Sequence, residues 1–227
     1  MINEIELKQL WQTTNEKLEE RIVLNRAHFD NTTKLKFYNS LGSMKPVKVF
    51  TLLLGVLWVC ITGTVVLNLF LFAFDSVSLF FLFSAAIQIG LTAIALVIYI
   101  YQLITIYQVD ITEPILKTQK KLVTLKISTL WVSRILFLQL PVWTTFYWNS
   151  SMLENGNWFL WIFQGIVTLS FSGVAIWLFF NIKYENKDKK WFQLIFNGKE
   201  WTPLMKAMKL SKQIKEYKDN NAIEQIA

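Results

Sequence analysis

The stretch that decides the fold is residues 49–74, VFTLLLGVLWVCITGTVVLNLFLFAF, an apolar run without a single charged residue. About 20 such residues cross a hydrocarbon core roughly 30 Å thick as a helix, so the run predicts a membrane-spanning helix. Three further runs, residues 79–107, 130–147 and 158–182, contain no charge except Arg134. The expected spans are residues 49–74, 79–107, 127–147 and 158–182.

The basic residues predict how these spans are oriented. All 23 lysines and arginines lie in residues 8–48, 117–134 and 183–218, and the loops 73–78 and 148–157 contain none. Lys and Arg collect in the cytoplasmic loops of membrane proteins, so we expect an inner (plasma) membrane protein with both termini in the cytoplasm. The fold class expected is all-α, an integral membrane four-helix bundle with cytoplasmic amphipathic helices at both termini.

Three regions follow from this pattern: a cytoplasmic helical segment (1–46), a four-span domain (47–182) and a basic, amphipathic tail (183–227). In the first segment, apolar residues at helical spacing form one stripe. Ser40, Gly42, Ser43 and Pro46 are expected to break this helix before the first span. The stripe includes Leu7, Leu10, Trp11, Leu18, Ile22 and Phe29.

Two more helix starts are readable. Thr112-Glu113-Pro114 is typical of a first helical turn, and the helix over residues 115–126 is expected to run directly into the third span. Thr202-Pro203 opens a final helix with one apolar side. That side contains Leu204, Met208, Ser211, Ile214 and Tyr217.

Few residues are suited to catalysis or to binding a cofactor. Cys60 and His28 are the only cysteine and histidine, so an intrachain disulfide is impossible and a zinc site built from His and Cys is not expected. The four spans contain no Asp, Glu or His, and no motif for phosphate or metal chemistry is present. We therefore expect a protein that is not an enzyme and needs no cofactor.

The net charge of +7 has two interpretations. One is a nucleic-acid partner. The other, which the clustering next to apolar spans favours, is membrane topology together with attraction to anionic lipid, about 1 kcal/mol per basic residue near the surface.

Arg134, Gln139 and Gln164 are the polar residues within the spans that deserve a test. A charge inside a membrane indicates a functional site by default, so Arg134 is a candidate for transport or substrate binding. The structural interpretation, which we favour, is that Arg134 reaches the inner headgroups. The two glutamines either line a polar pore or bond between helices, and the second is more common.

The order of parts resembles an uncharacterised family of four-span membrane proteins from Bacteroidota. That resemblance implies a gene neighbourhood with extracytoplasmic-function sigma factors and hence a membrane-held regulator of such a factor; it supplies no catalytic residues. The segments that carry it are residues 6–12 (ELKQLWQ), 15–18 (NEKL), 108–114 (QVDITEP), 119–126 (QKKLVTLK), 190–192 (KWF) and 206–208 (KAM).

Two functional hypotheses remain open. The first is a membrane-tethered regulator or scaffold that holds a cytoplasmic partner in a helix-in-groove mode; its alternative is that the same stripe packs on residues 115–126 and 204–217. The second is a small channel, transporter or lipid-binding subunit, which with four spans would have to form a homo-oligomer. The docking face of the first hypothesis consists of Leu7, Trp11, Leu18, Ile22 and Phe29.

Overall fold

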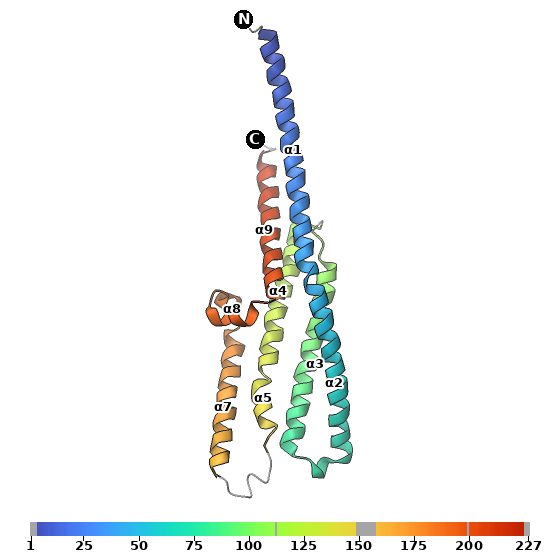
Figure 1. The fold of residues 1–227 in the computed structure, drawn as a ribbon, viewed down its shortest axis with the longest axis vertical. Helices are drawn as coiled ribbons and strands as arrows, with labels where there is room; N and C mark the ends of the chain where they lie inside the picture. The colour runs from blue at the N-terminus through green and yellow to red at the C-terminus, as the bar shows by residue number, and fades with distance from the viewer. Residues whose placement is uncertain (1–3, 112, 149–157, 199, 225–227) are drawn as a thin grey trace.

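A computed structural model describes residues 4–111, 113–148, 158–198 and 200–224, without the side chains of several residues in the first and last helices. The described residues form helices and no strand, as the composition predicted (Figure 1). Both chain termini lie at one end of an elongated bundle, which we call the terminal end (Figure 1). The helices are α1 (Glu4–Gly42), α2 (Met44–Phe72), α3 (Leu79–Gln108), α4 (Ile115–Phe137), α5 (Leu140–Thr145), α7 (Trp158–Asn181), α8 (Lys190–Phe196) and α9 (Trp201–Glu224), with 3-10 turns η1 (Phe74–Ser76) and η2 (Tyr184–Asn186).

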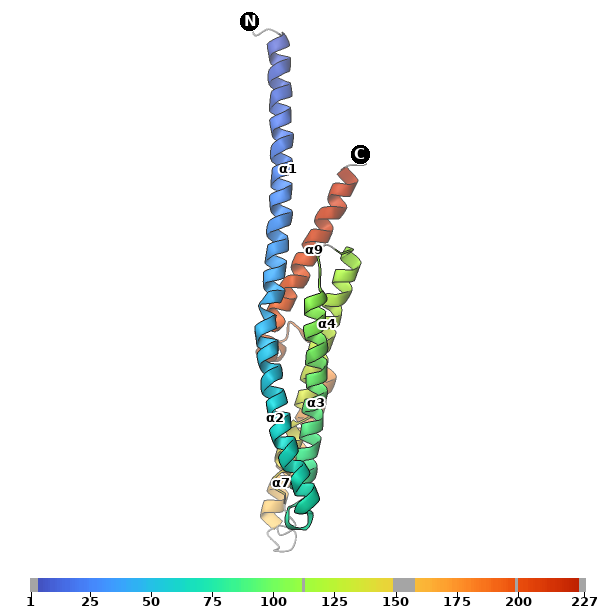
Figure 2. The same ribbon diagram turned by 90° about the vertical axis from the view of Figure 1, so that its right-hand side faces the viewer.

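The break expected between the first helix and the first span is only one residue long. Ser43 separates α1 from α2, keeps right-handed helical angles (φ −64°, ψ −19°) and donates its backbone N–H to the Asn39 carbonyl at 3.0 Å. The two helices therefore continue in nearly the same direction (Figures 1 and 2). Pro46 falls in the first turn of α2, where a missing N–H has little effect. Leu41 and Met44, on either side of the break, are buried in the same core.

Helices α2 and α3 form an antiparallel hairpin, with η1 at the bend (Figure 2). Gly55 makes room for the side chain of Leu96. A Cβ placed on Gly55 would lie 2.5 Å from Leu96 Cδ2 of α3, which is too close for a real contact. A larger residue at this position would therefore require the Leu96 side chain to move.

The third apolar run forms one candidate span, residues Leu116–Thr145, with a short interruption that the sequence analysis did not predict. The predicted continuation of residues 115–126 is confirmed, because α4 runs unbroken to Phe137. The helix then stops, and α5 begins at Leu140 with Pro141 as its second residue. Pro141 has no N–H to donate to the preceding turn. Just before it, the Gln139 N–H bonds to the Leu136 carbonyl at 3.2 Å, three residues back, which makes a tighter turn than the α-helix. The chain therefore kinks at this point.

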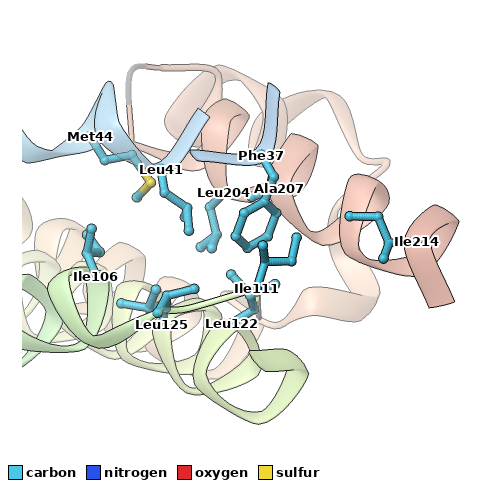
Figure 3. Close-up of a cluster of buried hydrophobic side chains, with 11 residues drawn as sticks. Phe37, Leu41, Met44, Ile106, Ile111, Leu122, Leu125, Leu204, Ala207 and Ile214 are labelled. Carbon is cyan, nitrogen blue, oxygen red and sulfur yellow. The ribbon is translucent and has the colours of Figure 1, made fainter. Parts of the chain in front are cut away.

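Two buried clusters lie toward the terminal end. The first, which we call the terminal core, joins α1, α3, α4 and α9 (Figure 3). The second, the aromatic core, joins α4, α7, α8 and the start of α9. The terminal core contains Phe37, Leu41, Met44, Ile106, Val109, Ile111, Leu122, Leu125, Leu204, Ala207 and Ile214. The aromatic core contains Leu130, Leu178, Ile182, Phe192, Phe196 and Trp201.

Four helical stretches are long and apolar enough to cross a membrane: residues Asn31–Phe72, Leu79–Gln108, Leu116–Thr145 and Trp158–Asn181. In the first and the fourth stretch, only 6% of the most apolar 18-residue window is buried inside the bundle. Most of the large apolar side chains there are therefore exposed on the surface, which is unusual for a soluble protein. This surface supports a multi-pass membrane protein.

Candidate functional site

Trp11 and Leu18 of the expected docking face lie on the part of α1 that extends beyond the rest of the bundle. Helix α9 packs along the second half of α1 and tilts away from it toward the C-terminus, so the first half of α1 projects past it (Figures 1 and 2). Trp11 and Leu18 are 69% and 54% exposed. Leu7, Ile22 and Phe29 also belong to α1, but their side chains lie outside the described part of the structure. Packing of Trp11 and Leu18 on residues 115–126 or 204–217, the alternative considered above, is thus not observed.

Farther along α1, residues that neighbour this face become buried. Thr33 and Phe37 follow Phe29 at intervals of four residues, and they are 6% and 0% exposed. Phe37 lies between α9 and the α3–α4 connection in the terminal core (Figure 3). Helix α1 is therefore covered by the chain's other helices near residue 37 and uncovered near residue 11.

A second contact fixes the direction in which α1 projects. The Tyr38 hydroxyl donates to Asp110 Oδ1 at 2.7 Å and accepts the Ile111 N–H at 3.0 Å. Both partners belong to the segment between α3 and α4. Beside the buried Phe37, these hydrogen bonds hold the base of the projecting helix against the bundle.

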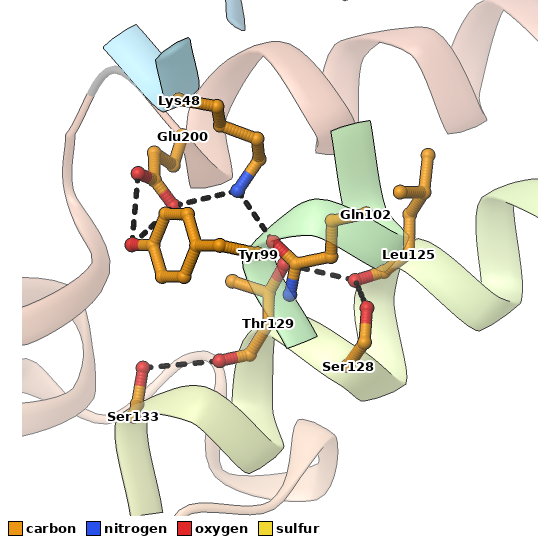
Figure 4. Close-up of polar contacts among 8 residues, drawn as sticks. All are labelled: Lys48, Tyr99, Gln102, Leu125, Ser128, Thr129, Ser133 and Glu200. Atoms are coloured by element: carbon orange, nitrogen blue, oxygen red, sulfur yellow. Dashed lines mark hydrogen bonds and ion pairs between the residues drawn. The ribbon is translucent and has the colours of Figure 1, made fainter. Parts of the chain in front are cut away.

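A buried polar network joins α2, α3 and Glu200, the residue before α9 (Figure 4). The Lys48 ammonium donates to Gln102 Oε1 at 2.5 Å and to Glu200 Oε2 at 3.0 Å, and its side chain is 1% exposed. It also lies 4.4 Å from the centroid of the Tyr99 ring. The Tyr99 hydroxyl donates to Glu200 Oε1 at 3.0 Å. We call Lys48, Tyr99, Gln102 and Glu200 the junction network.

The junction network has the properties of a structural tie. A buried ammonium is tolerated only when it is paired and hydrogen-bonded, and here Gln102, Glu200 and the Tyr99 ring satisfy it together. Gln102 Nε2 has no hydrogen-bond partner among the described residues. No group of three His, Cys, Asp or Glu residues that could hold a metal occurs in the described part of the chain.

Arg134 joins α4 to the end of α7. Its Nε and Nη2 atoms donate to the Ile182 carbonyl oxygen at 2.9 and 2.6 Å, and its guanidinium lies 5.0 Å from the centroid of the Trp131 ring. Ile182 directly follows α7, whose last carbonyls lack partners within the helix. A cation at a helix C-terminus is also favoured by the helix dipole.

The two glutamines bond between helices in separate places. Gln139 Nε2 donates to Thr92 Oγ1 of α3 at 2.8 Å. Gln164 Nε2 donates to the Thr144 carbonyl of α5 at 2.6 Å. The structure therefore does not bring Arg134, Gln139 and Gln164 together into one site.

The sequence interpretation missed the junction network. In the sequence, Lys48 is one of the basic residues before the first apolar run and Glu200 is part of the tail. One signal was present, since Glu200 is the only acidic residue between Asp188 and Glu216. Its partner, 152 residues away, could not be inferred from spacing.

Comparison of the sequence with protein-family models, with curated proteins and with solved structures finds no match. The assignment of a function therefore depends on the geometry described above.

Proposed function

We propose that this protein is a multi-pass inner-membrane scaffold that holds a soluble cytoplasmic protein on the projecting part of α1. The lysines and arginines support the orientation, because they lie in the segments nearest the terminal end and are absent from the α2–α3 bend. By the rule that basic residues stay inside, the terminal end faces the cytoplasm. Protease treatment of intact cells tests this: cleavage near residue 20 or residue 210 from outside would overturn the orientation.

The observation that carries the proposal is the change in exposure along α1. Phe37 is fully buried, and Trp11, on the projecting half of the same helix, is 69% exposed. Large aromatic residues dominate the energetics of protein interfaces, and an exposed Trp on a charged helix has no role in the chain's own packing. The surrounding Glu16, Lys17 and Glu19 would form the polar rim.

The partner that fits this surface is a protein with an apolar groove that accepts one helix. The gene neighbourhood that the resemblance implies makes an extracytoplasmic-function sigma factor the first candidate. Since α1 is anchored through Phe37 and the Tyr38 hydrogen bonds, the docking face is preformed and little ordering is required on binding.

The test is capture of soluble protein by the full-length chain in mild detergent, with matched variants. Trp11→Asp with Leu18→Asp should remove capture, because truncation of a central interface anchor typically costs 2 kcal/mol or more, about 30-fold in affinity. Val23→Asp with Leu24→Asp is the control, since these residues are 63% and 61% exposed on other faces of the same helix.

Equal capture by the two double variants would exclude this face as the docking site. Cross-linking of α1 only to a second copy of the chain would replace the proposed partner with a homo-oligomer. The channel or transporter alternative gains no support from Arg134, Gln139 and Gln164, because each donates to another helix.

A further inference from the structure

Lys126 and Lys187, which are distant in the sequence, both lie over the ring of Tyr184, near the start of α9. Lys126 Nζ of α4 lies 3.8 Å from the ring centroid, and Lys187 Nζ lies 4.9 Å from it and 3.5 Å from the Tyr184 hydroxyl. The two ammonium groups therefore cannot be farther apart than the sum of the two centroid distances. Two positive charges around one ring create a local positive potential that favours an anion nearby.

No carboxylate neutralises this pair within the described part of the chain. The ion pairs there join Lys48 to Glu200, Lys121 to Glu113 and Lys212 to Glu216. Glu185 and Asp188 are near in sequence, but both are exposed and neither pairs with Lys126 or Lys187. The positive charge at Tyr184 is thus available to a ligand.

Lys187 also lines a small pocket between α8 and the start of α9. The pocket has a volume of about 190 Å³ and a floor formed by the buried rings of Phe192, Phe196 and Trp201. Pockets for drug-sized ligands measure roughly 300–1,000 Å³, so this one accepts a smaller group. Its polar rim consists of Lys187, Gln193, Asn197 and Thr202.

The rim has the chemistry of an anion site. A lysine ammonium, two amides and a hydroxyl can all donate hydrogen bonds, and a phosphate oxygen is an acceptor. Trp201 and Thr202 begin the 24-residue α9, so the pocket borders the start of that helix. The groups available to an anion are the side chains, because the Thr202 N–H bonds to the Gly198 carbonyl at 3.2 Å and Pro203 has no N–H. Tyr184 connects the pocket to Lys126, because its ring lies 6.5 Å from that of Trp201.

We infer that this pocket, with Lys187 on its rim and Lys126 across the Tyr184 ring, binds a phosphate group. The surroundings favour the headgroup of an anionic phospholipid. Leu194, on the same short helix, is 87% exposed, and the Trp177–Trp191 ring contact at 4.9 Å joins α8 to the apolar α7. An exposed Leu beside interfacial Trp residues is typical of a helix lying in the membrane surface. The assignment of the bound phosphate to a lipid depends on the membrane insertion proposed above, whereas the existence of the phosphate site does not.

Native mass spectrometry of the full-length protein in detergent tests the site. We expect one phosphatidylglycerol molecule per chain to be retained, and phosphatidylcholine to be retained at least tenfold less well. Lys126→Gln with Lys187→Gln should weaken phosphatidylglycerol binding about 30-fold, the effect of removing two basic residues near a lipid phosphate. Lys189→Gln with Lys190→Gln is the matched control, because it removes the same charge from exposed residues of the same segment and should change binding less than twofold.

Inorganic phosphate distinguishes the source of the ligand. Displacement of phosphatidylglycerol by millimolar phosphate would assign the site to a phosphate from solution, and retention would assign it to the lipid. Equal losses in the two double variants, or equal retention of both lipids, would overturn the site and leave only general attraction to a basic surface. Lys126→Arg with Lys187→Arg keeps the charge and should restore binding, which separates loss of the site from a loss of folding. Because capture on α1 is a separate measurement, failure of this site leaves the docking proposal unaffected.

Discussion

Replacing Glu200 by alanine should destabilise the protein more than replacing its partner Lys48 by methionine. Without Glu200, an ammonium whose side chain is 1% exposed remains inside the bundle without its counter-charge. Without Lys48, the remaining carboxylate side chain is 23% exposed and still accepts the Tyr99 hydroxyl at 3.0 Å. The two variants break the same ion pair, but they leave charges in very different surroundings.

The structure sets the expected magnitudes. Removing one partner of a buried ion pair costs about 3–5 kcal/mol because the other charge stays buried and unpaired. Lys48 keeps its hydrogen bond to Gln102, so we expect about 3 kcal/mol for Glu200→Ala. Lys48→Met fills similar space with an apolar chain and leaves a carboxylate that water reaches, so we expect about 1–2 kcal/mol.

The assay is the free energy of unfolding of the full-length protein in mild detergent, measured by denaturant titration for each single variant and for the double variant. The double variant should be about 1–3 kcal/mol more stable than the sum of the single effects predicts, because neither charge is left alone. Hydrogen exchange in α9 should accelerate in Glu200→Ala, since the pair ties the start of α9 to α2 and α3.

The exposed pair Lys212–Glu216 provides a control. Its side chains are 74% and 58% exposed, so Glu216→Ala should cost less than about 0.5 kcal/mol. Strictly additive effects in the Lys48 and Glu200 cycle, or a cost for Glu200→Ala no greater than that for Lys48→Met, would refute the reasoning.

Two further predictions concern helix contacts. Gly55→Val should cost about 1–3 kcal/mol more than Gly63→Val, because a Cβ at residue 55 meets Leu96 at 2.5 Å and one at residue 63 meets nothing within 4 Å; equal unfolding free energies would contradict the close approach. Arg134→Gln should cost about 1.5–3 kcal/mol through loss of the charged hydrogen bonds to the Ile182 carbonyl. Ion flux through the protein in liposomes should not change with this variant, and a loss of flux would instead support a transport role.

The kink in the third apolar run shows where periodicity is insufficient. The run's composition predicted a helix, and α4 follows that prediction through residue 137. Pro141 marked a local loss of one hydrogen bond, but a proline in an apolar run is compatible with a continuous kinked helix or with two helices. The neighbouring Gln139 bonds to Thr92 of α3, and this contact forms only when the helices are packed together.

The projecting half of α1 shows the same limit for the candidate site. The apolar stripe through Trp11 and Leu18 was readable, because helical period is a local property. Whether the stripe is covered depends on the direction and tilt of α9, which are set by contacts such as Phe37 with the terminal core. Spacing alone therefore left docking and internal packing equally open.

By itself, the sequence determined the all-helical class, the four apolar runs and the single end at which the basic residues gather. These properties depend on composition and on the spacing of residues that are close together in the sequence, and neither depends on how the helices pack. The tertiary structure alone decided which partners the lysines meet, because Lys48 pairs with Glu200 and Lys126 lies over the ring of Tyr184 across long stretches of chain. Such contacts result from the way whole helices pack, and no local pattern encodes them.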